Sequence, residues 1–189
     1  MTDVRLLLFW CAKNNETQRE HKKMLTNQEA TYLLELEKVL VNPNQTIDLK
    51  NKKNRIELIS HQDSDYEFWV EITTNQKIIL KTSIHHLESN SFIGLLRIDY
   101  RGGHHNPENI ENTLPEFLKP YANKWFEPTE PHMHIYVEGY KNLAWAIPLI
   151  DIDFPIKEII QPSDLSDLIF NFARRINLKS IINIQQAIL

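Results

Sequence analysis

Alternation of apolar and polar residues between about residues 46 and 101 constrains the fold of this chain more than any other feature of the sequence. Five segments there alternate or run apolar, and short clusters of Asn, Lys, Asp, Ser and Gln separate them. These segments are 46–49, 55–60, 66–73, 77–84 and 91–101. Successive side chains of a strand point to opposite faces, and short connections join antiparallel neighbours. The pattern therefore predicts an antiparallel meander with one apolar and one polar face.

Two helices are predicted to pack on this sheet. Residues 26–29 have the pattern of a capping box, and Leu33, Leu36 and Leu40 continue it as an apolar stripe. Near the other end, a proline-led start precedes apolar residues at helical spacing over 162–176. Helices of this kind bury their apolar stripe against the apolar face of a sheet.

The remaining segments complete the predicted architecture. The long connection 102–131 carries apolar residues from 114 to 126, which we expect to dock as a short helix. A strand over 132–140 is followed by a hairpin partner over 143–150, and the residues after 178 suit either a helix or a strand. The sequence thus predicts a single α+β domain. Its mostly antiparallel meander sheet has about six to seven strands, with one N-terminal and one or two C-terminal helices packed on it.

Domain organisation follows from length and periodicity. The 189 residues suit one domain rather than two, and we expect that domain to span residues 24–189. Residues 1–23 have little periodicity, so they are predicted to be an N-terminal extension or to precede the native start, with a short packed helix as the alternative. No apolar run approaches the roughly 20 residues that span a bilayer, which predicts a cytoplasmic protein.

Composition excludes some kinds of site. Cys11 is the single cysteine, which rules out an internal disulfide and a cysteine-based zinc site. Residues 1–23 hold five of the 21 Lys and Arg and three of the 25 Asp and Glu, which leaves residues 24–189 with a net charge of −6. An acidic body of this kind argues against non-specific binding of nucleic acid, although it leaves room for a local basic groove.

The segment 131–140 carries the main candidate site. Its alternation places His132, His134, Tyr136 and Glu138 on one face of a predicted strand, and apolar residues on the other. Imidazole, phenol and carboxylate groups can move protons or bind phosphate or metal. Because two imidazoles and a phenol seldom gather for packing alone, this face is a candidate functional site.

Several motifs of the chain resemble those of a known family. They are Met-Leu-Thr-Asn-Gln-Glu-Ala-Thr-Tyr-Leu-Leu-Glu-Leu-Glu-Lys at 24–38, Leu-Leu-Arg-Ile-Asp at 95–99, Gly-His-His-Asn-Pro at 103–107, Pro-His-Met-His-Ile-Tyr-Val-Glu-Gly-Tyr at 131–140 and Trp-Ala-Ile-Pro-Leu at 145–149. From about residue 24 to 178 they are similar in order and spacing to an uncharacterised bacterial family of small cytoplasmic proteins. The resemblance implies a shared set of motifs without an established activity, so function is argued from chemistry.

The leading hypothesis is a metal-independent ribonuclease, in which a ribose 2′-hydroxyl attacks the adjacent phosphate. This reaction needs a base and an acid with pKa values near neutrality, and histidine has such a pKa. The expected catalytic residues are His132, His134, Tyr136 and His104. No cofactor is expected on this hypothesis. By analogy with small proteins of this build, the biological setting would be a toxin of mobile elements.

Other residues are expected to support this chemistry from neighbouring segments. Arginine can hold a phosphate through two parallel hydrogen bonds, and a buried carboxylate can orient a histidine. The expected substrate-binding residues are Arg97, Arg101 and Asn106, and the expected orienting residues are Asp99 and Glu138. The strand that carries Arg97, Asp99 and Arg101 is therefore predicted to form the wall opposite the histidines.

A divalent-metal site, with zinc as the example, is the second hypothesis. Two histidines at i and i+2 of a strand can converge on one ion, with His104 or Asp99 as the third ligand beside His132 and His134. Glu138 lies too far along the strand from His132 to share the ion.

Two further hypotheses involve no catalysis. In the first, the polar residues of the two strands form a structural network, with Glu138 paired to Arg97 or Arg101. Alternatively, a phage or mobile-element protein would use this surface to bind a protein partner, as an inhibitor or an antitoxin does. RNA, an antitoxin and a host complex are thus the expected partners. His61, His85 and His86 are expected to be solvated.

Overall fold

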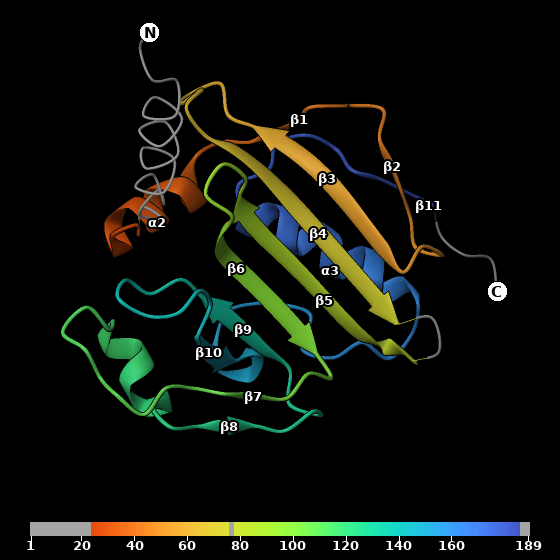
Figure 1. Ribbon diagram of the computed structural model, residues 1–189. Helices are drawn as coiled ribbons and strands as arrows, with labels where there is room; N and C mark the ends of the chain where they lie inside the picture. Colours follow the sequence, from red (N-terminus) through yellow and green to blue (C-terminus); the bar gives the residue numbers. More distant parts are fainter. Residues whose placement is uncertain (1–23, 76–77, 186–189) are drawn as a thin grey trace, which may run out of the picture.

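A seven-stranded antiparallel sheet forms the centre of the computed structural model (Figure 1), which describes residues 24–75 and 78–185. The expected extension at residues 1–23 lies outside the described residues, as do residues 186–189. In spatial order the strands are β1 (Val39–Leu40), β3 (Lys53–Ile59), β4 (Glu67–Asn75), β5 (Ile78–Glu88), β6 (Ile93–Tyr100), β9 (His132–Ile135) and β10 (Trp145–Pro148). The predicted α+β domain with an antiparallel meander is confirmed.

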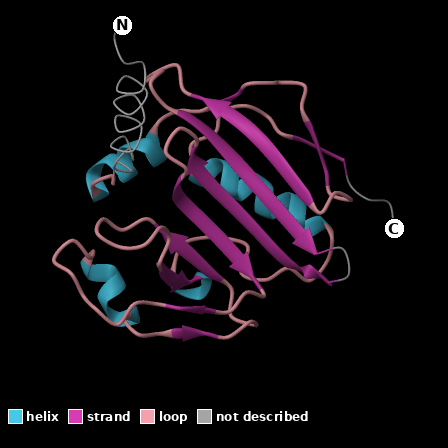
Figure 2. Cartoon of the chain, in the orientation of Figure 1, coloured by secondary structure: helices cyan, strands magenta, loops and turns pink. Residues whose placement is uncertain are grey.

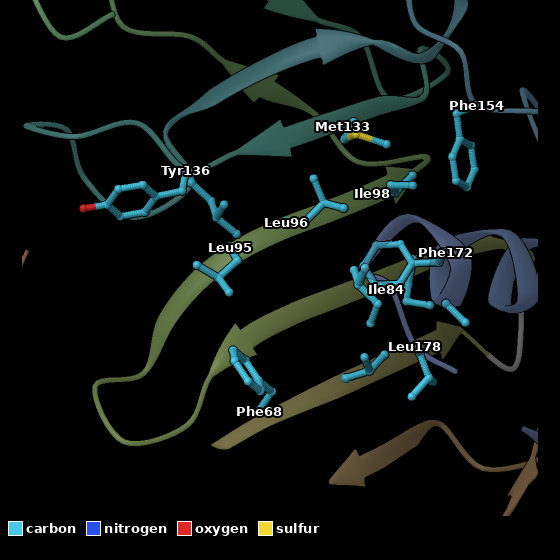
Figure 3. Close-up of a cluster of buried hydrophobic side chains, with 14 of the residues drawn as sticks. Phe68, Ile84, Leu95, Leu96, Ile98, Met133, Tyr136, Phe154, Phe172 and Leu178 are labelled. Atoms are coloured by element: carbon cyan, nitrogen blue, oxygen red, sulfur yellow. The ribbon is translucent and has the colours of Figure 1, made fainter. Parts of the chain in front are cut away.

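The helix α3 (Ser163–Arg175) covers the apolar face of this sheet, as Figures 1 and 2 show. Its residues Leu168 and Phe172 are buried, and so are Phe68 of β4 and Ile84 of β5. Figure 3 shows Phe172 among the buried side chains of the sheet. Burial of each such side chain contributes about 1.5–3 kcal/mol, so the alternation of the strands decides which face the helix occupies.

The helix α2 (Asn27–Glu35) begins at the predicted capping box. The Thr26 hydroxyl accepts a hydrogen bond from the Glu29 amide at 3.1 Å, and the Glu29 carboxylate accepts one from the Thr26 amide at 2.8 Å. The predicted stripe through Leu40 is wrong at its end, because Leu36 caps the helix with extended backbone angles. Leu40 lies instead in β1, where it pairs with β3.

The ends of both helices meet at Lys38, which is completely buried. Its ammonium donates to the carbonyl oxygens of Leu34 at 3.2 Å, Leu36 at 2.8 Å and Ile176 at 3.1 Å. A lysine ammonium has three donors, and carbonyls at helix C-termini lack partners within the helix. Lys38 therefore satisfies the last turn of α2 and the end of α3 with one side chain.

Smaller elements complete the fold. The strands β2 (Thr46–Asp48) and β11 (Asn183–Gln185) form a parallel pair, so the ambiguous C-terminal segment contains a strand. The strands β7 (His104–His105) and β8 (Trp125–Phe126) form an antiparallel pair. Two 3₁₀ helices, η1 (Glu116–Tyr121) and η2 (Leu149–Asp151), lie in the connections around β8 and β10. Among the described residues no helix is both long and apolar enough to cross a bilayer.

Candidate functional site

The register of β6 and β9 gathers polar side chains on the face of the sheet opposite α3. Arg97 of β6 lies opposite His134 of β9, and Asp99 lies opposite His132. Directly opposite residues of neighbouring strands share a face, whereas the intervening Met133 points into the core. The pairing thus brings together four residues that the sequence analysis assigned to one site.

Both histidines of β9 are completely buried and anchored to the backbone. Nδ1 of His132 lies 2.8 Å from the carbonyl oxygen of Glu130, and Nδ1 of His134 lies 2.9 Å from that of Leu143. A carbonyl oxygen can only accept, so these contacts assign a proton to each Nδ1. In the neutral imidazole each Nε2 then carries a lone pair.

Those lone pairs converge on Asp99. The Asp99 Oδ2 atom lies 3.0 Å from Nε2 of His134 and 3.9 Å from Nε2 of His132. The three donor atoms all lie within 4.8 Å of one another, and Nε2 of His132 has no hydrogen-bond partner among the described residues. We refer to Asp99, His132 and His134 as the histidine–aspartate cluster.

The positively charged side chain of Arg97 contacts two members of the cluster, His134 and Asp99. Its Nη2 atom donates to Nε2 of His134 at 2.8 Å. Its Nε atom lies 3.0 Å from Asp99 Oδ2, an ion-pair contact without the alignment of a hydrogen bond. Two acceptors at 3.0 Å, Nε2 of His134 and Oδ2 of Asp99, repel each other unless a cation lies beside them. The Arg97 side chain is 32% exposed, so it can leave the cluster toward solvent.

Burial determines the protonation of the cluster. It lowers the pKa of His134 to about 4, despite the opposing effect of Asp99, and it also lowers the pKa of His132. Burial acts to raise the pKa of Asp99, but the charge of Arg97 and the hydrogen bond from Ser83 oppose it, and the pKa stays below its ordinary value. At pH 7 the cluster therefore holds neutral imidazoles and an ionised carboxylate, which is the state that binds a metal ion.

His104 covers the cluster from β7. Its ring centroid lies 4.4 Å from that of His134 and 5.8 Å from that of His132. Its Nε2 atom lies 2.9 Å from the carbonyl oxygen of Ala144 and 3.0 Å from the Asn106 Oδ1 atom, so this nitrogen carries a proton and donates. The predicted three-histidine ligand set is therefore not assembled through Nε2, and Asp99 is the third member of the group.

Asn106 was expected to bind substrate, but the structure uses its amide inside the protein. The side chain is 1% exposed. Its Oδ1 atom accepts from the Ala146 amide at 2.8 Å, and its Nδ2 atom donates to the carbonyl oxygens of Ala146 at 2.8 Å and Tyr121 at 2.9 Å. Ala146 belongs to β10, the edge strand of the sheet, where backbone groups lack a partner strand. Asn106 takes the place of that partner.

Replacing Asn106 with alanine should lower the free energy of unfolding by about 2–4 kcal/mol, because two buried backbone groups of β10 lose their partners. Urea denaturation followed by tryptophan fluorescence measures this change. Asn171, replaced in the same way, serves as the control; its amide makes only a solvent-exposed hydrogen bond to the Asp167 carbonyl oxygen, and its loss should cost less than about 0.5 kcal/mol. A loss below about 1 kcal/mol for Asn106→Ala would show that water replaces the amide.

Tyr136 lies apart from the cluster. The strand β9 ends at Ile135, so the alternation on which the shared face depended stops one residue earlier. The Tyr136 hydroxyl donates to the carbonyl oxygen of Leu25 at 2.7 Å, and Figure 3 shows the ring directed away from Met133. The phenol therefore ties the strand to the segment before α2.

Glu138 was expected to orient a histidine or to pair with an arginine, and the structure contradicts both expectations. Its carboxylate accepts a hydrogen bond from the backbone amide of Asn27 at 3.2 Å, at the start of α2. The Glu138 amide donates in turn to the Asn27 side chain at 2.9 Å. A carboxylate is favourable at a helix N-terminus, where backbone amides lack partners. Glu138 therefore fixes α2 to the chain that leaves β9.

Arg101 also lies outside the cluster. It follows the last residue of β6, has a positive φ of 58° and is exposed. The chain leaves the sheet at this turn, so the alternation that places Arg97 and Asp99 on one face does not extend to Arg101. Of the three residues predicted to lie opposite the histidines, Arg97 and Asp99 do so and Arg101 does not.

Two residues of β5 join the site although the sequence analysis missed them. His85 lies opposite Arg97, and Ser83 lies opposite Asp99 and donates a hydrogen bond to it. His85 and His86 were expected to be solvated; instead His86 is completely buried, with its ring 5.4 Å from that of Phe68. Alternation continues to the end of β5, so extending the predicted strand beyond residue 84 would have placed His85 on the polar face and His86 on the apolar face.

Comparison with known proteins gives one match. A family model with the description Family of unknown function (DUF6978) matches residues 25–178. No curated protein and no solved structure matches the chain. The matched range contains the whole histidine–aspartate cluster together with Arg97 and His104. The resemblance that the motifs indicated is confirmed.

Proposed function

Since the chain belongs to DUF6978, a family of unknown function, we propose its activity from the site itself: Asp99, His132 and His134 bind a divalent metal ion that hydrolyses a phosphate ester. The observation that carries this proposal is the convergence of two anchored imidazoles on one carboxylate. Metal-binding histidines commonly donate their other ring nitrogen to a backbone carbonyl, as His132 and His134 do here.

The distances of the histidine–aspartate cluster support the proposal. Ligand atoms at about 2.0–2.1 Å from a tetrahedral zinc ion lie roughly 3.4 Å apart. The separations of 3.0 and 3.9 Å between Asp99 Oδ2 and the two Nε2 atoms lie on either side of this value. All three ligand atoms lie within 4.8 Å of one another, so binding an ion requires the rings of His132 and His134 to move toward each other. Two histidines and one carboxylate leave a further position for water, as catalytic zinc sites do.

Arg97 has a defined role in this proposal. With the ion bound, its guanidinium leaves Nε2 of His134 and moves toward the exposed side of the site. There it is placed to pair with the phosphate of a substrate, since arginine binds phosphate through two parallel hydrogen bonds. A bound ion would supply an activated water: the water oxygen would bond to phosphorus as the ester P–O bond breaks, and the proton that the water loses would pass to the leaving alcohol.

Metal-independent cleavage of RNA is a second candidate, favoured by the cationic Arg97 only 2.8 Å from Nε2 of His134. It would need a protonated histidine near neutral pH, and burial lowers the pKa of His104, His132 and His134. It would also need ring nitrogens that reach a substrate, whereas both nitrogens of His134 are engaged. These features favour the metal hypothesis, with RNA as one candidate phosphate ester.

Titration with Co²⁺ tests the proposal, because cobalt substitutes for zinc and absorbs visible light. We expect the wild type to bind one ion and to unfold at a higher temperature when loaded, since a ligand that binds only the folded state stabilises it. Asp99→Asn and His134→Gln should each lose affinity by at least about a hundredfold. His61→Gln removes an exposed histidine and should bind cobalt like the wild type.

Thermal unfolding in EDTA shows whether each variant is folded before its affinity is compared. Binding that persists in both cluster variants would place the ion elsewhere and end the proposal. Incubating the wild type with RNA, once in the presence of zinc and once in the presence of EDTA, distinguishes the metal-dependent hydrolase from the metal-independent ribonuclease. Cleavage that persists in EDTA favours the metal-independent ribonuclease. A protein that neither binds metal nor cleaves RNA would favour the inhibitor or antitoxin role.

A further inference from the structure

A pocket of about 320 Å³ opens directly beside the histidine–aspartate cluster. It lies at the end of the sheet where β4 and β5 are joined, and it reaches the residues that follow β6. Its lining includes Lys52, Thr73, Lys81, Ser83, Asp99 and Gly102. Asp99 thus belongs both to the cluster and to the wall of the pocket. A pocket of this volume is large enough for a small molecule.

Two lysines contribute positive charge to the pocket, beside the carboxylate of Asp99 in its wall. Lys52 and Lys81 are both exposed, and neither forms an ion pair within the described part of the chain. The backbone of Lys52 is held against β4, because its carbonyl oxygen accepts from the Thr74 amide at 2.9 Å. Two like charges on one rim repel each other unless an anion lies between them. This arrangement favours an anionic ligand.

Neutral donors and an open passage accompany the two lysines. Thr73 lines the pocket, and Ser83 connects the pocket to Asp99 through its hydrogen bond. A side chain at Gly102 would begin 3.5 Å from the Asp99 Cβ atom and 3.8 Å from its Oδ2 atom. Glycine at this position therefore keeps the carboxylate open toward the pocket.

We infer that this pocket is the phosphate subsite of the proposed metal centre, an inference that rests on the proposed function. Lys52 and Lys81 hold the phosphoryl group of the substrate, and Thr73 donates to one of its oxygens. Phosphate oxygens accept charge-assisted hydrogen bonds from lysine, the chemistry that both cations offer. The group then lies next to Asp99, where the ion would act on the ester bond.

Titration of the metal-free, full-length chain with inorganic phosphate tests the subsite apart from the metal. We expect chemical-shift changes in the amide NMR signals of Thr73, Ser83 and Gly102. Lys52→Gln and Lys81→Gln should each weaken phosphate binding by about tenfold, since a hydrogen bond to a charged group is lost. Lys53→Gln is the matched control, because it removes the same charge from a neighbour that pairs with Glu71 at 2.8 Å and lies outside the pocket lining.

The outcomes separate this inference from the proposed function. Equal losses in Lys53→Gln, or no shifts at the three amides, would overturn the subsite. Phosphate binding by a wild type that binds no cobalt would overturn its assignment to a metal centre. The Lys52→Gln, Lys81→Gln double variant should still bind cobalt like the wild type. Competition by a mononucleotide or by a short single-stranded RNA then identifies the source of the phosphate group; either supports the subsite.

Discussion

Replacing Arg97 with methionine should tighten the binding of a divalent metal ion by about a hundredfold, because the variant removes a competing cation. The Arg97 guanidinium contacts Nε2 of His134 at 2.8 Å and Oδ2 of Asp99 at 3.0 Å, so it uses the lone pairs that the ion would need. Methionine preserves most of the side-chain volume and carries no charge. Competition between the protein and a chelator for Co²⁺ measures the change in affinity.

In the metal-free protein, the same substitution should lower stability. Without Arg97, the ionised Asp99 faces the lone pair of His134 with no cation beside it. The thermal unfolding temperature of Arg97→Met in EDTA should therefore fall, and saturating zinc should restore it. Arg55→Met is the control, since Arg55 stacks on Trp69 on the same sheet, with its guanidinium carbon 3.4 Å from the ring centroid. Metal affinity that stays unchanged in Arg97→Met would contradict the proposed competition.

Replacing Lys38 with methionine should lower the free energy of unfolding by about 3–5 kcal/mol. Methionine fits the space but cannot donate, so the carbonyl oxygens of Leu34, Leu36 and Ile176 lose a common partner. Urea denaturation at pH 7 measures the change. Lys50→Met, at an exposed position, should change the stability by less than about 0.5 kcal/mol. A loss for Lys38→Met as small as that of the control would show that the three carbonyls need no lysine.

The pH dependence of Lys38 has a definite sign. Burial lowers the pKa of Lys38 to about 7 in the folded protein, whereas an unfolded lysine titrates near about 10.4. Between these pH values the unfolded chain binds the proton and the folded chain releases it, so the contribution of Lys38 to stability rises with pH. The stability difference between the wild type and Lys38→Met should therefore widen from pH 7 to pH 9. A difference that is constant over this range would contradict the lowered pKa.

Much of the site follows from patterns within single strands. The alternation around residues 91–101 placed Arg97 and Asp99 on one face of their strand. The alternation within residues 131–140 placed His132 and His134 on one face of theirs, and the pairing of the two strands puts all four on the same side of the sheet. The same rule failed for Tyr136, because a pattern of alternating residues does not show where a strand ends. The strand β9 stops at Ile135, which pairs with Trp145, the first residue of β10.

The histidine and asparagine of the Gly-His-His-Asn-Pro motif illustrate a second limit. Their side chains suit catalysis or substrate binding, and nothing in the motif distinguishes those roles from a structural one. In the structure His104 and Asn106 donate to backbone groups beside and within β10, at the edge of the sheet. Backbone groups at a strand edge lack partners only in the assembled sheet, so the sequence alone does not predict that His104 and Asn106 bond to them.

Periodicity along the chain is enough to predict the sheet, its two faces, both helices and the histidine pair, because side-chain direction along a strand or helix repeats over a few residues. Which residues of the two strands meet depends on their register, so only the folded structure shows that Arg97 lies opposite His134 and Asp99 opposite His132. It also decided that the imidazoles are neutral and the carboxylate ionised at pH 7, because burial and the contacts of Asp99 set these charges. Proximity and desolvation are properties of the folded chain, and they make the histidine–aspartate cluster a candidate metal centre.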